Sequence, residues 1–141
     1  MNMQLEVKDR VQRQLVDIIG NVQVDKDGDF SFRYESTRLY ISVRPYADNS
    51  ATVEIFTLTN IHVPRTPELF KYVATRDYLY GAFRVNDEPD GTVSVLVTHT
   101  LLGDTIDADE LKIALFNMMV AADEVDDEIK NKFGGERFYE D

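Results

Sequence analysis

The sequence predicts an α+β fold in which an N-terminal helix, an antiparallel strand meander, a second helix, a β-hairpin and a long C-terminal helix follow one another. Two observations support this prediction. Apolar residues recur every three or four positions near both ends of the chain and every second position between them. No βαβ repeat joins any two strands, so the sheet should be mostly antiparallel, with the helices gathered on one face.

The first element is an amphipathic helix over residues 3–19, which ends at Gly20, where a left-handed C-cap is most common. Its apolar side chains recur at three- and four-residue spacing and are Val7, Val11, Leu15, Ile18 and Ile19. This stripe is expected to face the sheet.

Period-two alternation follows, and it predicts the strands of a meander. The turn Asp27-Gly28 separates a strand at 22–24 from a strand at 30–34, which is typical of a β-hairpin. Leu39, Ile41 and Val43 form the next strand, which should end at Pro45; residues 47–50 form a turn, and Val53, Ile55 and Thr57 continue the sheet.

The acidic run at 25–29 also resembles a calcium loop. An EF-hand needs glycine at loop position six and a bidentate acid at position twelve. With Gly28 sixth, Gln23 is first and Tyr34 is twelfth, and neither offers a carboxylate. A plain hairpin turn is therefore the favoured interpretation, and no metal site is predicted.

The second half of the chain begins with a helix start, with Thr66 as N-cap and Pro67 at the first helical position. This helix should run to about Tyr78, before Gly81. Phe83 and Val85 then pair with Val93, Val95 and Val97 across a turn at 86–91. A capping box at 107–110 opens the longest helix, which should reach about Lys132 and end at Gly134-Gly135.

The composition of the chain excludes several classes of partner. The 141 residues fit one domain, 1–141, and a hydrophobic content of 43% is enough for a core. Lys and Arg number 15 against 26 Asp and Glu, a net charge of −11, so we expect neither nucleic acid nor an anionic membrane as partner. No segment resembles a membrane span or a signal peptide, and a cytoplasmic location is the default expectation.

The motifs of catalysis are absent from the sequence. Cysteine is missing, and His62 and His99 are the only histidines, without an acid or ligand partner at a recognised spacing. No serine lies in a nucleophile elbow, and no glycine-rich phosphate loop precedes a helix. We therefore predict no catalytic residue, no cofactor and a non-enzymatic protein.

The long helix is apolar on two faces. The stripe toward the sheet consists of Leu111, Leu115, Met118, Ala122, Val125 and Ile129. Ile113, Phe116 and Val120 fall on nearly the opposite side, at 100° per residue. Either the first helix or a loop covers these three residues, or they form a dimer or partner surface.

The strands place a second unusual set of residues on the outward side of the sheet, out of phase with the core. Seven of these residues are predicted to bind a peptide: Arg33, Tyr40, Arg44, Phe56, Leu58, Arg84 and Leu96. Arg38 belongs to the same set. Tyr and Arg are enriched at interface hot spots. The alternative is that Arg–Tyr packing merely coats an open sheet.

Three segments resemble the YbjN family, grouped with the class I type III secretion chaperones in one chaperone-like fold. They are the helix ending at Gly20 with the valine strand and acidic turn at 21–30, the helix start at 66–69, and the closing helix from 109 to 123. The resemblance implies a small acidic protein, often dimeric, that binds peptide segments or modulates a regulatory partner. YbjN-like proteins occur in organisms without that secretion system, so no secretion role is carried over.

Two functional hypotheses follow. In the first, the chain binds another polypeptide, with an extended segment along the sheet or an exposed strand edge; Phe56, Leu58 and Leu96 form apolar pockets, and Arg33, Arg44 and Arg84 select acidic residues. In the second, the chain is a small-molecule sensor or an enzyme without a familiar motif, which predicts a closed pocket of roughly 300–1,000 Å³ with converging polar groups.

Overall fold

The computed structural model describes residues 2–139. Its elements are α1 (Met3–Ile18), β1 (Gln23–Val24), β2 (Phe30–Tyr34), β3 (Thr37–Tyr46), β4 (Ser50–Val63), α2 (Pro67–Ala74), β5 (Ala82–Asp87), β6 (Val93–Leu102), α3 (Ala108–Phe133) and β7 (Glu136–Arg137). The predicted order of helix, meander, helix, hairpin and helix is confirmed. The short strand β7 was not predicted.

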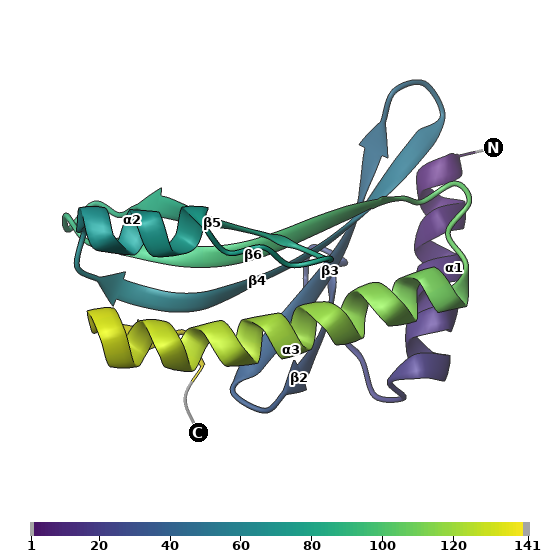
Figure 1. The fold of residues 1–141 in the computed structure, drawn as a ribbon. Coiled ribbons are helices and arrows are strands. Elements are labelled where there is room, and N and C mark those ends of the chain that lie inside the picture. The colour runs from purple at the N-terminus through teal and green to yellow at the C-terminus, as the bar shows by residue number, and fades with distance from the viewer. Residues whose placement is uncertain (1, 140–141) are drawn as a thin grey trace.

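Every strand pair in the described part of the chain is antiparallel, in one sheet of order β1-β2-β3-β4-β6-β5. The long strand β4 lies at its centre. On one side it pairs with β6 along most of its length; on the other it pairs with β3 as far as Phe56 and with β7 at Asn60 and Ile61. Figure 1 shows the resulting strongly twisted sheet, with the β3–β4 hairpin projecting at one end.

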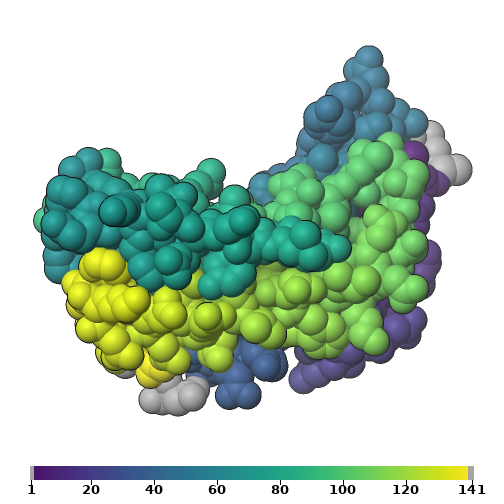
Figure 2. Space-filling view, viewed as in Figure 1, coloured from purple at the N-terminus to yellow at the C-terminus, as the bar shows by residue number. Residues whose placement is uncertain are grey.

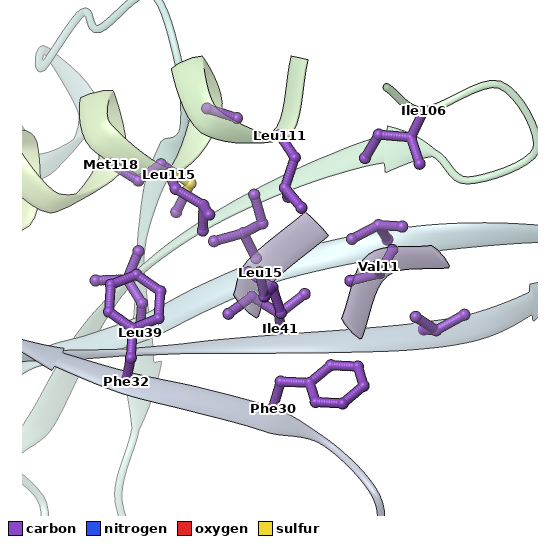
Figure 3. Close-up of a cluster of buried hydrophobic side chains, with 14 of the residues drawn as sticks. Val11, Leu15, Phe30, Phe32, Leu39, Ile41, Ile106, Leu111, Leu115 and Met118 are labelled. Atoms are coloured by element: carbon purple, nitrogen blue, oxygen red, sulfur yellow. The ribbon is translucent and has the colours of Figure 1, made fainter. Parts of the chain in front are cut away.

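The main core lies between the sheet and the helices α1 and α3. All six residues of the predicted α3 stripe are buried, and the first four of them pack with residues of α1 such as Val11 and Leu15. Figure 3 shows Phe30, Phe32 and Leu39 of the sheet near these helices. A second buried cluster joins α2 to the other end of α3 and contains Leu69, Val73, Val125 and Ile129, with valines of β4 and β6. The helices are thus gathered on one face, as predicted.

Helix caps follow the sequence signals. Asn2 accepts a hydrogen bond from Gln4 N at the start of α1, Thr66 from Leu69 N at the start of α2, and Asp107 from Glu110 N in the capping box of α3. The predicted end of the second helix at about Tyr78 is wrong, because α2 ends at Ala74. Thr75 N still donates to Lys71 O, but Arg76 N donates to Val73 O at 3.3 Å, three residues back, which tightens and ends the last turn.

Three strands are longer than predicted. β6 continues from Val97 to Leu102. β3 continues through Pro45 to Tyr46, beyond the end of its pairing with β2, so proline lies in an edge segment where its missing N–H is tolerated. β4 continues past Thr57 to Val63 through two register shifts, and His62 there has a φ of 55°. These bulges break the alternation from which the strand was predicted.

Candidate functional site

The outward face of the sheet carries all seven residues predicted to bind a peptide. Each alternates along its strand with residues of the core face, which are buried beside six of them and partly buried beside Arg84. The registers arrange them in rows across the sheet. One row contains Tyr40, Phe56, Thr98 and Ala82, from β3, β4, β6 and β5. The next contains Leu58, Leu96 and Arg84. Neighbouring rows on one face are about 7 Å apart.

An aromatic pair stands at the centre of this face. The rings of Tyr40 and Phe56 stack with centroids 5.4 Å apart and an interplanar angle of 15°. Both side chains are half-buried. Burial and a hydrogen bond with the Tyr139 hydroxyl raise the pKa of Tyr40 to about 12, so its hydroxyl stays neutral in the physiological range. The pair therefore offers an apolar surface with an O–H group at its rim.

The row beside this pair is apolar with a basic end. Leu96 is only 7% exposed between its cross-strand neighbours Leu58 and Arg84, so it forms the floor of the face, not an open pocket. Leu58 is half-buried and Arg84 is exposed. A ligand on this row would contact Leu58 and the stem of Arg84 and only touch Leu96.

The two remaining predicted arginines lie at different distances from this centre. Arg33 faces Arg38 across the β2–β3 pair, beside the row of Tyr40. Arg44 lies four residues along β3 from Tyr40, about 13 Å away at the rise of a strand, near the β3–β4 turn. The structure thus brings Arg33 close to the aromatic pair and leaves Arg44 on the projecting hairpin.

A hollow of about 320 Å³ continues the face beyond Leu58. Leu58, Ile61 and Pro89 provide apolar lining, and Glu88 and Asp90 provide carboxylates. Both acids already accept hydrogen bonds, Glu88 from the Ser94 hydroxyl at 2.7 Å and Asp90 from Thr92 N at 2.9 Å. Its size is at the lower limit for a small-molecule pocket, and its polar groups are engaged locally.

Within residues 2–139, the helices leave the outward face of the sheet uncovered, because the buried clusters that hold α1, α2 and α3 lie on the other face. In Figure 1, α3 runs below the strands β4 and β6. In Figure 2, α2, β5 and α3 form much of the visible surface, and the β3–β4 hairpin projects beyond them at one end. An uncovered sheet face can hold an extended chain.

Sequence reasoning missed one contributor to this face, Tyr139. Its hydroxyl lies 2.7 Å from that of Tyr40, and its ring packs edge-on against Phe138. The guanidinium carbons of Arg38 and Arg33 lie 5.7 and 6.0 Å from its ring centroid. The sequence offers one indication of this contribution, the adjacent aromatic residues Phe138 and Tyr139 that follow Gly134-Gly135. The glycines predict only the end of the helix.

The second predicted surface, on α3, is exposed in this single chain. Ile113, Phe116 and Val120 are 48%, 41% and 58% exposed, so neither α1 nor a loop covers them. The interpretation that a neighbouring element buries these residues is therefore wrong. What remains is an apolar stripe on the surface of an acidic molecule.

Neither histidine belongs to a group that could hold a metal ion, as no such cluster of three or more ligands exists in residues 2–139. His99 accepts a hydrogen bond from Gly81 N, and His62 pairs with Glu136. No helix in the same range is long and apolar enough to cross a bilayer.

Comparison with known proteins agrees with this arrangement. The profile of the family TY-Chap1, described as T3SS (YopN, CesT) and YbjN peptide-binding chaperone 1, matches residues 6–141. The chain belongs to this family. It is thus a peptide-binding chaperone by family and not an enzyme, as the sequence predicted. No curated protein matches the chain significantly.

A solved structure has the same fold. A chain in the crystal structure of the Yersinia pestis type III secretion chaperone SycH, in complex with a stable fragment of YscM2, superposes with a TM-score of 0.57. The alignment covers 84% of this chain and 98% of that one, at 11% sequence identity. At this identity the likeness concerns the fold, which confirms the predicted chaperone-like architecture of this TY-Chap1 member.

Proposed function

We propose that this TY-Chap1 protein acts in the cytoplasm by binding an extended segment of another polypeptide on the outward face of its sheet. The observation that supports this most directly is the stacked pair Tyr40 and Phe56, which is partly exposed on the side of the sheet opposite to the helices. Leu58 extends the apolar surface into the next row, over the floor formed by Leu96. Large aromatic residues on an open face are typical anchors for a protein partner.

Charge gives the proposed site its selectivity. Arg33 and Arg84 lie at opposite ends of the face, on β2 and β5, while the molecule as a whole carries a charge of −11. A guest with acidic residues beside its apolar ones pairs with these arginines, whereas the overall negative charge disfavours long-range attraction. Selectivity therefore comes from local contacts, and Arg44 on the hairpin adds to them for a longer guest.

A matched pair of variants tests this site. Peptides selected from a displayed random library for binding to the protein are fluorescently labelled, and their Kd is measured by polarisation. The variant Phe56→Glu with Leu58→Glu should weaken binding at least about tenfold, because two carboxylates replace the apolar anchors. The control, Thr52→Glu with Leu102→Glu, adds the same charge to one row of the same face that lies two rows from Phe56, and it should bind short selected peptides like the parent.

Circular dichroism and thermal unfolding of both variants show whether the fold is kept. If the Phe56 and Leu58 variant is folded and binds the selected peptides as tightly as the parent, the proposed surface is wrong. A screen of metabolites by thermal shift addresses the second hypothesis, since a ligand of the native state raises the Tm. A large shift with a metabolite and no selected peptide would favour the small-molecule sensor.

We also propose that two copies associate through the stripe Ile113, Phe116 and Val120 on α3. The stripe is exposed, apolar and continuous along one helix face, which suits a self-complementary contact about a two-fold axis. Light scattering of the purified protein should give the mass of a dimer, and Phe116→Glu should give that of a monomer. A monomeric parent protein at high micromolar concentration would contradict this assignment.

A further inference from the structure

The segment that follows α3 folds back against the centre of the sheet. Gly134 and Gly135 have φ values of 89° and 75°, a backbone conformation that favours glycine. A Cβ on Gly135 would lie 2.8 Å from Ile61 O and 2.9 Å from Val63 Cα. Glycine at this position therefore allows the tail to approach the backbone of β4 directly.

The tail then adds a strand to an unoccupied edge. β3 stops pairing with β4 at Phe56, which leaves the next part of β4 without a neighbour on that side. β7 fills this place, with Arg137 opposite Asn60 and Glu136 opposite Ile61, and Phe138 N donates to Thr59 O at 2.9 Å. This is strand addition by the protein's own chain.

Beyond this short strand, the tail reaches the outward face. Tyr139 extends the aromatic row formed by Tyr40 and Phe56, through the 2.7 Å contact between its hydroxyl and that of Tyr40. Arg33 and Arg38 flank its ring at distances suited to cation–π contacts. The tail thus contacts Tyr40 and Arg33, two of the residues that the proposed function assigns to a guest peptide.

The remaining bonds of the tail are suited to release. β7 has only two residues. The pair formed by Glu136 and His62 is mostly exposed, with exposed fractions of 61% and 57%, and an exposed ion pair of this kind stabilises little and is screened by salt. Arg137 is 28% exposed and pairs with Asp127 at 2.8 Å. A competing chain needs to replace a strand pairing of only two residues.

We propose that residues 136–139 are an intramolecular occupant of the peptide site, which a guest must displace. The inference rests on the proposed function and specifies its ligand: an extended segment that pairs with β4 at Thr59–Ile61 and carries an aromatic residue, by preference tyrosine, into the seat formed by Arg33, Arg38 and Tyr40. The apparent Kd for a guest is its intrinsic Kd divided by the fraction of molecules in which the tail is undocked, so a docked tail weakens binding.

The test uses the tail itself as probe, a fluorescein-labelled peptide of residues 133–141 with the sequence FGGERFYED. Its binding is compared in the parent, in Gly135→Ala and in Gly91→Ala. Both glycines have positive φ, but a Cβ on Gly91 meets nothing within 4 Å, so only Gly135→Ala is expected to dislodge the tail. Gly135→Ala should bind the peptide at least about fivefold more tightly than the parent. Gly91→Ala should bind like the parent.

A second variant, Tyr139→Ala, removes the aromatic contact without altering the turn, and it should also bind the probe more tightly than the parent. A probe with alanine in place of its tyrosine should bind weakly to every protein. Equal binding of the intact probe by the parent, Gly135→Ala and Tyr139→Ala, or binding by none of them, would overturn the inference.

The library-selected peptides distinguish the failure of this inference from the failure of the proposed function. If these peptides bind the parent through Phe56 and Leu58 but neither tail variant changes their Kd, the tail proposal alone fails.

Discussion

Ser36 Oγ lies 2.7 Å from Asp126 Oδ2 and 3.0 Å from Asp123 Oδ1, which joins the β2–β3 turn to the middle of α3. A hydroxyl has one proton and cannot donate to both carboxylates. Asp126 is 1% exposed, and its Oδ1 has no hydrogen-bond partner within residues 2–139. Burial, together with the nearby charges of Asp127 and Asp123, raises the pKa of Asp126 to about 6. Protonated Asp126 can donate to Ser36 while Ser36 donates to Asp123.

This arrangement predicts a pH-dependent stability. The pKa of Asp126 is 3.8 when unperturbed and about 6 in the folded chain, so the folded state binds a proton more tightly than the unfolded state between these values. The contribution of Asp126 to the free energy of unfolding therefore increases as pH falls from above 6 toward 4, and is lost as pH rises through 6. Asp126→Asn should reduce the stability difference between pH 5 and pH 8 by ~1–3 kcal/mol.

Urea unfolding at the two pH values measures this difference, with Glu124→Gln, an exposed position on the same helix, as the control. If Asp126→Asn keeps the full pH dependence of the parent, another group is responsible for it.

Any larger residue in place of Gly103 should clash with its neighbours, although Gly103 does not have a positive φ. It is buried where the chain leaves β6, and its N–H donates to Ala51 O at 2.7 Å. A Cβ there would lie 2.6 Å from Val7 Cγ1 and 2.9 Å from Ala51 O. Gly103→Ala should lower the free energy of unfolding by about 1–3 kcal/mol, as overpacking does. A loss below about 0.5 kcal/mol by urea unfolding would show that α1 shifts easily.

Truncation of two adjacent residues of α3 should have very different effects on the stability of the protein. Leu115 is fully buried, and Leu115→Ala should destabilise the protein by about 2–5 kcal/mol. Phe116 is 41% exposed, and Phe116→Ala should change the stability of the monomer by less than about 1 kcal/mol. Chemical unfolding at low protein concentration, where self-association is minimal, distinguishes the two. Equal losses would mean that Phe116 is covered in solution.

Local signals account for most of the fold. The caps at Thr66 and Asp107 place the starts of α2 and α3, and strand alternation places the core residues of β2, β3 and β6. The strand order, with β6 between β4 and β5, depends on contacts between distant segments, and no local pattern specifies it. The early end of α2, where Arg76 N donates to Val73 O, lies several residues before Gly81, and no glycine or proline marks it in the sequence.

The sequence predicts which residues lie on the outward face of the sheet, but it predicts neither how deeply each is buried nor that Tyr139 contacts this face. Alternation alone assigns Tyr40, Phe56 and Leu58 to the outward side. The burial of Leu96 depends on which strands flank β6, so it could not be foreseen. Tyr139 reaches this face only because β3 leaves part of β4 free, a tertiary feature that residues 134–139 do not encode by themselves.

The most direct measurement is an NMR titration of the isotope-labelled protein with a library-selected peptide, with amide and methyl shifts followed across the sheet and α3. The largest changes should occur at Tyr40, Phe56 and Leu58, with small changes at the exposed α3 residues Ile113 and Val120. Shifts concentrated on the α3 stripe, with the sheet face unaffected, would contradict binding on the outward face.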